Sequence, residues 1–290
     1  MKNQTWLKIM HEIVFVVAIL VVLVTYGTCK HDAKQNEVHP DSNKDITYNI
    51  GGVDFKLKRI DAIQDVMLGD NTRDDNKEHK VSLSSYYIGE TEVTQELWLA
   101  VMKTNPSNFK GSLKLPVEQV SWFDCIKFCN ELTVQVMGQE HCVYEGQDAS
   151  IKADFSKKGF RLPTEAEWEV AAMGGLSQKY AGCNDDNELA LYAWYEGNAD
   201  GKTHDVGAKK ANKYGLYDMS GNVWEWVFDW YDINTPSEGK DPVGVPSGDD
   251  RVSRGGSYLN YVAECSRAYR ACEAPQVNYP SFGLRLACRP

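Results

Sequence analysis

No cysteine pair in this sequence has CxxC spacing, and no cysteines and histidines cluster at the spacing of a zinc finger. The six histidines are scattered, so their positions do not suggest a two-histidine, one-carboxylate iron site. A phosphate-binding glycine loop is also missing, and Gly255-Gly256-Ser257 does not have the pattern of a nucleophile elbow. These absences leave zinc, iron, nucleotide and serine-hydrolase chemistry without a motif.

The chain has fewer positively charged residues than negatively charged ones. The chain has 31 Lys and Arg residues against 41 Asp and Glu residues, so its formal net charge is −10. Such a balance does not attract a polyanion, and we expect no nucleic-acid partner. An acidic surface can bind divalent cations, but keeping the protein soluble is the simpler interpretation.

Residues 1–29 have the pattern of an export signal. Ile13 to Val24 form a continuous apolar run of about a dozen residues, short of the roughly 20 that a membrane-spanning helix needs. Such a run is typical of a signal-peptide core, and the following Cys29 predicts a bacterial lipoprotein that is lipidated at this thiol. An uncleaved anchor and an ordinary signal peptide remain alternatives. All three predict an exported protein, either in the periplasm or at the cell surface.

The remainder of the chain divides into a tether and one domain. Residues 30–45 are polar and lack an apolar period, which predicts a flexible tether to the membrane. Residues 46–290 are enough for a single domain with a sizeable core. Alternation predicts strands around Val53 to Leu57 and Val81 to Ile88, whereas little periodicity and no repeat follow Gly174. We therefore predict an α+β fold with a high content of irregular structure.

Three helices are predicted from their capping residues. The candidate caps are Thr91 or Thr94, Ser121 with Asp124, and Thr164 with Glu167. In the third helix Glu165, Glu167 and Glu169 lie two residues apart, so they do not share a helical face as paired catalytic carboxylates would. Capping and a solvated face are the roles we expect for them.

Six phrases then occur in a fixed order. They are EVTQELW (92–98), PVEQVSWFD (116–124), RLPTEAEWE (161–169), YGLYDMSGNVWEW (214–226), RGGSY (254–258) and FGLR (282–285). This order and spacing resembles the formylglycine-generating enzyme (sulfatase-modifying factor) family over roughly residues 50–290. The resemblance implies a single domain of α+β fold, related to C-type lectin domains. It does not decide the activity, because the fold also serves sulfoxide synthases, envelope lipoproteins and ligand-display proteins.

The resemblance also implies a structural calcium ion (Ca2+). Its ligands would be Asp218, Gly221, Val223 and Glu225, which match the family's positions. Carboxylate and backbone carbonyl oxygens suit this ion. The alternative is that the two carboxylates only cap the loop and accept hydrogen bonds from buried amides. The family's second calcium site, near Trp194 to Asp200 here, is not carried over because this loop is shorter.

The oxidase of this family holds Cu(I) between two thiolates that follow the Gly-Gly-Ser-Tyr phrase. Counted without gaps from Ser257, the first position falls on Asn260 and the second on Cys265. Asparagine cannot act as a thiolate, and an alignment on Arg270 opens a gap that removes Cys265 as well. The chain is therefore expected to lack the cysteine pair. Cys265 is the one catalytic candidate, with a buried structural thiol as the alternative.

A disulfide is implied by the same resemblance. In the family a cysteine at the position of Cys129 pairs with one beside the closing arginine, and the nearest candidate here is Cys288, three residues after Arg285. Export to an oxidising compartment favours the pair. The alternative is that Cys129 packs as an apolar side chain and Cys288 stays free.

Three functional hypotheses follow. The first is a non-catalytic binding or scaffold lipoprotein of the bacterial envelope, whose partner is a protein, peptide or glycan. The second is a formylglycine-generating oxidase, that is a sulfatase activator, or a related oxidase that uses Cu(I). The third is a ligand-display protein in which the segment Tyr258 to Pro280 varies between copies.

Overall fold

The computed structural model describes residues 44–234, 236 and 238–290. The predicted signal, Cys29 and most of the tether therefore lie outside the described residues. Within the described part of the chain, no helix is long and apolar enough to cross a membrane. The description below concerns the unit that begins at Pro40.

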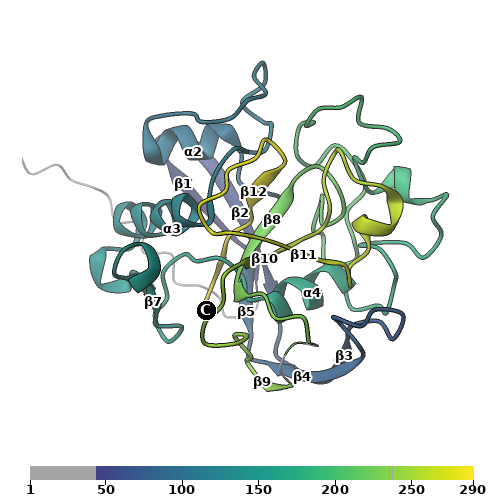
Figure 1. Ribbon diagram of the computed structural model, residues 1–290. Helices are drawn as coiled ribbons and strands as arrows, with labels where there is room; N and C mark the ends of the chain where they lie inside the picture. The colour runs from purple at the N-terminus through teal and green to yellow at the C-terminus, as the bar shows by residue number, and fades with distance from the viewer. Residues whose placement is uncertain (1–43, 235, 237) are drawn as a thin grey trace, which may run out of the picture. The chain divides into compact units, whose positions relative to one another are not determined.

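One half of the domain is a four-stranded antiparallel sheet covered by two helices. The strands, in spatial order, are β1 (Ile46–Ile50), β2 (Val53–Ile60), β5 (Tyr86–Gly89) and β13 (Ala287–Cys288). Helix α2 (Gln95–Met102) lies on β1 and β2 and packs against α3 (Trp122–Val136) (Figure 1). Trp98 of α2 stacks on Phe128 of α3 with ring centroids 4.7 Å apart. The last strand of the chain thus completes a sheet begun by the first.

The other half is a second four-stranded sheet with helix α4 (Glu165–Met173) beside it (Figure 1). Its order is β11 (Arg270–Glu273), β10 (Arg251–Arg254), β8 (Trp224–Trp230) and β12 (Phe282–Leu284), with β12 parallel to β8. The smaller sheets are β3 (Ile63–Leu68), β4 (His79–Leu83) and β9 (Gly239–Lys240), and β6 (Tyr144–Glu145) with β7 (Lys152–Ala153). Between α4 and β8 the only helix or strand of the described chain is a single short turn, Leu189–Leu191. The predicted α+β class is confirmed. The irregular structure lies mainly between α4 and β8, whereas the chain from Trp224 onward supplies all four strands of this second sheet.

The predicted helix starts are also confirmed. Thr94 rather than Thr91 caps α2, because its hydroxyl accepts the Leu97 amide at 3.1 Å. Both predicted capping boxes form at the starts of α3 and α4. The predicted strand at 81–88 was wrong in one respect. It is two strands, β4 and β5, which belong to different sheets and are separated at residues 84 and 85.

The solvated face predicted for the α4 glutamates is wrong. Glu165, Glu167 and Glu169 expose only 3%, 8% and 2% of their surface. Every residue of α4 is buried, so this helix has no solvent side on which charges could lie. The buried carboxylates of Glu165 and Glu169 are paired with arginines from distant parts of the chain. Glu167 is paired with Arg161, six residues before it.

Glu169 illustrates how these arginines bind the domain together. Its carboxylate accepts hydrogen bonds from Arg254 (2.5 Å), from Arg267 and from the Gly69 amide (2.8 Å). Asn76 donates a further bond at 3.2 Å. Two distant stretches of the chain, residues 69–76 and 254–267, are therefore joined through one buried side chain of α4.

The described cysteines are all free thiols. Cys129 and Cys288 are both buried in the same apolar core cluster, yet the structure does not join them. Burial raises the pKa of Cys288 to about 12, so this thiol is protonated at neutral pH. The implied disulfide is absent from the described residues, and Cys129 packs as an apolar side chain.

Candidate functional site

The loop that leads into β8 contains three of the four predicted calcium ligands, and the fourth, Glu225, is the second residue of β8 itself. Gly221 has a φ of +82°, and a Cβ at this position would lie 2.1 Å from the Trp194 carbonyl oxygen, so only glycine fits. The next two residues are held by Glu92, which accepts the Asn222 side-chain amide at 2.6 Å and the Val223 backbone amide at 3.1 Å. The loop is thereby fixed against the chain segment that precedes α2.

Glu225 is engaged by protein groups on both carboxylate oxygens. Arg285 donates to it from Nε at 3.0 and 2.9 Å and from Nη2 at 2.6 Å. Trp168 Nε1 donates a further bond at 2.6 Å. Both members of the Glu225–Arg285 pair are buried. Glu225 therefore has a complete set of partners without a metal ion.

Asp218 differs from Glu225. Its Oδ2 accepts the Gly207 amide at 2.7 Å, but its Oδ1 is buried and has no hydrogen-bond partner among the described residues. Burial raises the pKa of Asp218 to about 6. Burial and the nearby carboxylates of Asp218 and Glu225 also raise the pKa of Glu92 well above its usual range. This is the pattern expected where negative charge exceeds the positive charge available.

Some of the predicted ligands in this loop therefore suit a calcium ion, and others do not. An orphaned buried oxygen on Asp218 and an excess of carboxylates suit a small cation. Glu225 does not suit it, since Arg285 already neutralises that carboxylate. No group of three or more His, Cys, Asp or Glu side chains in the described chain has an arrangement suited to a metal ion. A calcium ion here would take Asp218 and backbone carbonyls, such as those of Gly221 and Val223.

The predicted thiol positions lie just after β10. Asn260 Oδ1 accepts the Ser257 hydroxyl at 2.5 Å, so its side chain closes the turn. Cys265 is fully buried, and burial raises its pKa to about 12. Cys183 shares the same small apolar cluster, but its thiol points to the Asp185 carbonyl oxygen at 3.8 Å. The two predicted positions are thus occupied by a turn-closing amide and a buried, protonated thiol, and they do not supply a thiolate pair.

The segment that follows Ser257 carries large exposed side chains. Leu259, Tyr261 and Tyr279 expose 55%, 68% and 51% of their surface. Tyr258 is buried and packs edge-on against Phe109, with ring centroids 5.3 Å apart. The exposed apolar groups thus lie beside a buried, packed aromatic ring, an arrangement that suits contact with a partner.

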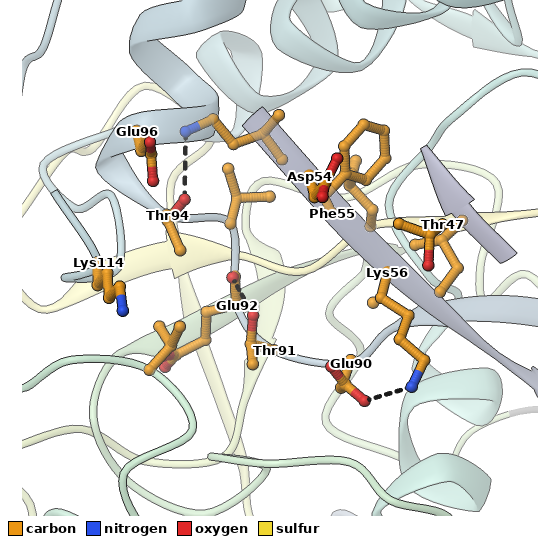
Figure 2. Close-up of a pocket in the computed structure, with 16 residues that line it drawn as sticks. Thr47, Asp54, Phe55, Lys56, Glu90, Thr91, Glu92, Thr94, Glu96 and Lys114 are labelled. Atoms are coloured by element: carbon orange, nitrogen blue, oxygen red, sulfur yellow. Dashed lines mark hydrogen bonds and ion pairs between the residues drawn. The ribbon is translucent and has the colours of Figure 1, made fainter. Parts of the chain in front are cut away.

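A separate pocket of about 400 Å³ lies between β2, the start of α2 and the segment around Lys114 (Figure 2). Its apolar lining is Phe55, Leu57, Val93, Leu97, Val206 and Leu286. Its charged lining is Asp54, Lys56, Glu90, Glu92, Glu96 and Lys114. Lys56 and Glu90 neutralise each other at 3.1 Å.

Comparison with known proteins identifies the family to which this chain belongs. Residues 32–290 match the sulfatase-modifying factor enzyme 1-like domain. The chain belongs to this family. The resemblance inferred from the six phrases is therefore confirmed, and so is the fold that it implied.

Proteins with different names are similar to this chain. It is 33% identical over 236 residues to the chaperone protein LppX of Paenibacillus barcinonensis, covering 71% of this chain and 81% of that protein. It is 37% identical over 152 residues to the formylglycine-generating enzyme of Thermomonospora curvata, covering 46% of this chain but only 50% of that enzyme. Among solved structures, Treponema denticola variable protein 1 has 44% identity and a TM-score of 0.78, covering 85% of this chain and 99% of that one.

The sequence analysis did not identify two residues that this sulfatase-modifying factor domain brings to the Asp218 loop. Glu92 and Arg285 occur in the first and last of the six phrases, yet the sequence did not assign either a role. The structure brings both to the Asp218 loop, since Glu92 binds Val223 and Arg285 binds Glu225. For Arg285 the signal is a charged residue directly after the buried Phe282-Gly283-Leu284 strand. The phrase around Glu92 is mostly polar and gave no such signal.

Proposed function

We propose that this protein is an exported, membrane-anchored binding or scaffold protein that does not carry out the oxidase reaction. The proposal rests on the side chains at the two positions where the oxidase has its thiolates, Asn260 and Cys265. Asn260 closes a turn, and Cys265 is a buried, protonated thiol. Linear Cu(I) coordination needs two accessible thiolates, which these side chains do not supply.

The similarities support a binding role. The relative with 33% identity over 81% of its length is named a chaperone, and the similar solved structure is named a variable protein. We propose that the partner, a protein, peptide or glycan of the envelope, contacts the surface of Leu259, Tyr261 and Tyr279. Exposed tyrosines are frequent anchors of binding surfaces because they bury a large area at a small cost in conformational entropy.

The oxidase hypothesis has a direct test. The purified domain is incubated with Cu(I), oxygen and a Cys-x-Pro-x-Arg peptide, with the Thermomonospora curvata enzyme as positive control. We expect no mass loss on the peptide cysteine, since the thiol pair is missing. Conversion by the wild type that is abolished by Cys265→Ser would establish the oxidase and overturn the proposal.

The display hypothesis is favoured by one observation, the similarity to a protein named a variable protein. Sequencing the region of residues 258–280 across sister strains decides it. Substitutions concentrated at exposed positions such as Tyr261 and Tyr279 would support display, whereas an invariant segment would support a single fixed partner.

Anchoring is tested at Cys29. The substitution Cys29→Ser is expected to release the protein from the membrane fraction, because the proposed lipid is attached to that thiol. The measurement is metabolic labelling with a palmitate analogue, followed by fractionation of wild type and variant. A wild-type protein that takes up no label would show that lipidation does not anchor it.

A further inference from the structure

The pocket beside α2 has two opposite charges that the protein leaves uncompensated. The Glu96 carboxylate and the Lys114 ammonium have no hydrogen bond or ion pair within the described chain, either with each other or with another side chain. The remaining rim charges are occupied, since Lys56 pairs with Glu90 at 3.1 Å and Asp54 accepts the Asn49 amide at 2.6 Å. Glu96 and Lys114 are therefore the charges available to a ligand.

The backbone holds these two residues on the same wall of the pocket. The Glu96 amide donates to the Leu113 carbonyl at 2.9 Å, next to Lys114 in the chain. The Lys114 carbonyl in turn accepts the Val206 amide at 3.0 Å. Figure 2 shows Glu96 and Lys114 on the Thr94 side of the pocket, with the Lys56–Glu90 pair on the opposite side. The fold thus fixes the backbone of both residues at this wall, and their side chains are partly or fully exposed.

The floor between the charges is apolar. Leu57, Leu97 and Leu286 are buried core residues that also line the pocket. The first-turn amides of α2 do not offer an anion site, because the amides of Gln95 and Glu96 are bonded to backbone carbonyls and that of Leu97 to Thr94. A ligand is therefore recognised by the two side-chain charges and by the floor.

We propose that this pocket binds a small zwitterion with an apolar side chain, that is, a free amino acid or a short peptide. Its ammonium group pairs with Glu96, its carboxylate with Lys114, and its apolar side chain lies on the leucine floor. A volume of about 400 Å³ accommodates a molecule of this size. The site is separate from the tyrosine surface and does not depend on the function proposed for it.

The proposal is tested by calorimetry and by NMR titration of the purified domain with leucine and with leucyl-leucine. We expect saturable binding of at least one of them at millimolar concentration, with shifts centred on the amides of Glu96, Leu97 and Lys114. The tighter of the two identifies the source of the ligand. N-acetyl-leucine lacks the ammonium group and leucinamide lacks the carboxylate, so both should bind more weakly.

Variants of the two charged residues test which group of the ligand each one binds. Glu96→Gln and Lys114→Met should each weaken binding by roughly five-fold, the scale of a partly exposed ion pair. In Glu96→Gln, leucine and N-acetyl-leucine should bind equally, because the partner of the ammonium group is gone. Lys127→Met removes an exposed lysine of α3 outside the pocket and should leave binding unchanged. Absence of binding to wild type, or equal binding by the two pocket variants and the control, would overturn the proposal.

Discussion

Replacing Glu169 with alanine is expected to lower the free energy of unfolding by about 3–5 kcal/mol, the cost of breaking a buried ion pair from one side. The variant leaves Arg254 and Arg267 in the interior without their carboxylate. It also removes the acceptor of the Gly69 amide and of the Asn76 side chain. The loss should therefore exceed that of any substitution on the surface of the domain.

The measurement is urea unfolding of wild type and variant, with the midpoint compared at constant slope. For a domain of this size the same loss corresponds to a fall in Tm of about 10 °C. Glu131→Ala is the matched control, since Glu131 is an exposed glutamate of α3. A loss at Glu169 no larger than that at Glu131 would show that the arginine network does not stabilise the fold.

The same network predicts a pH dependence. Burial opposes ionisation of Glu169, but Arg254 and Arg267 prevail and lower its pKa below 4.5. A carboxylate with a lowered pKa in the folded state stabilises the protein above its unfolded pKa, and this contribution is lost as the pH falls through the folded pKa. The difference in stability between wild type and Glu169→Ala should therefore shrink in acid, below about pH 4.5.

The second large effect is expected at the Asp218 loop, where we propose that calcium binds. At a calcium concentration of 100 times its Kd, the ion would add about 2.7 kcal/mol to the stability of the folded state. Chelation should therefore lower the Tm of wild type by several degrees. An unchanged melting curve in chelator, together with no calcium by elemental analysis, would show that the site is not there.

Two variants distinguish the ion from the neighbouring ion pair. Asp218→Ala should abolish the calcium response but cost little in chelator, because the wild-type carboxylate is buried with one unpartnered oxygen. Glu225→Ala should cost about 3–5 kcal/mol with or without calcium, because it leaves Arg285 buried and unpaired. If Asp218→Ala retained the response and only Glu225→Ala lost it, Glu225 would be the ligand and the proposed division of roles would be wrong.

Local sequence signals determined the helices of this protein. A capping box needs residues only three positions apart, so Ser121 with Asp124 and Thr164 with Glu167 could be identified without knowing the rest of the fold. The family phrases were equally local, and the resemblance that they carry implied the α+β class. Asn260 could also be placed by counting from Ser257, since no gap separates them.

Tertiary structure alone decided which charges are buried. Glu165 and Glu169 were assigned to a solvated face because a helix usually has one, whereas α4 is enclosed on all sides. Their partners Arg254, Arg267 and Arg270 lie 85 to 105 residues away, a separation that no local pattern detects. The same limit applies to Glu225, whose role depends on an arginine 60 residues later. The roles of Glu165, Glu169 and Glu225 follow from arginines that the fold brings to them from distant segments. Glu167 is the exception, because its partner Arg161 lies only six residues before it.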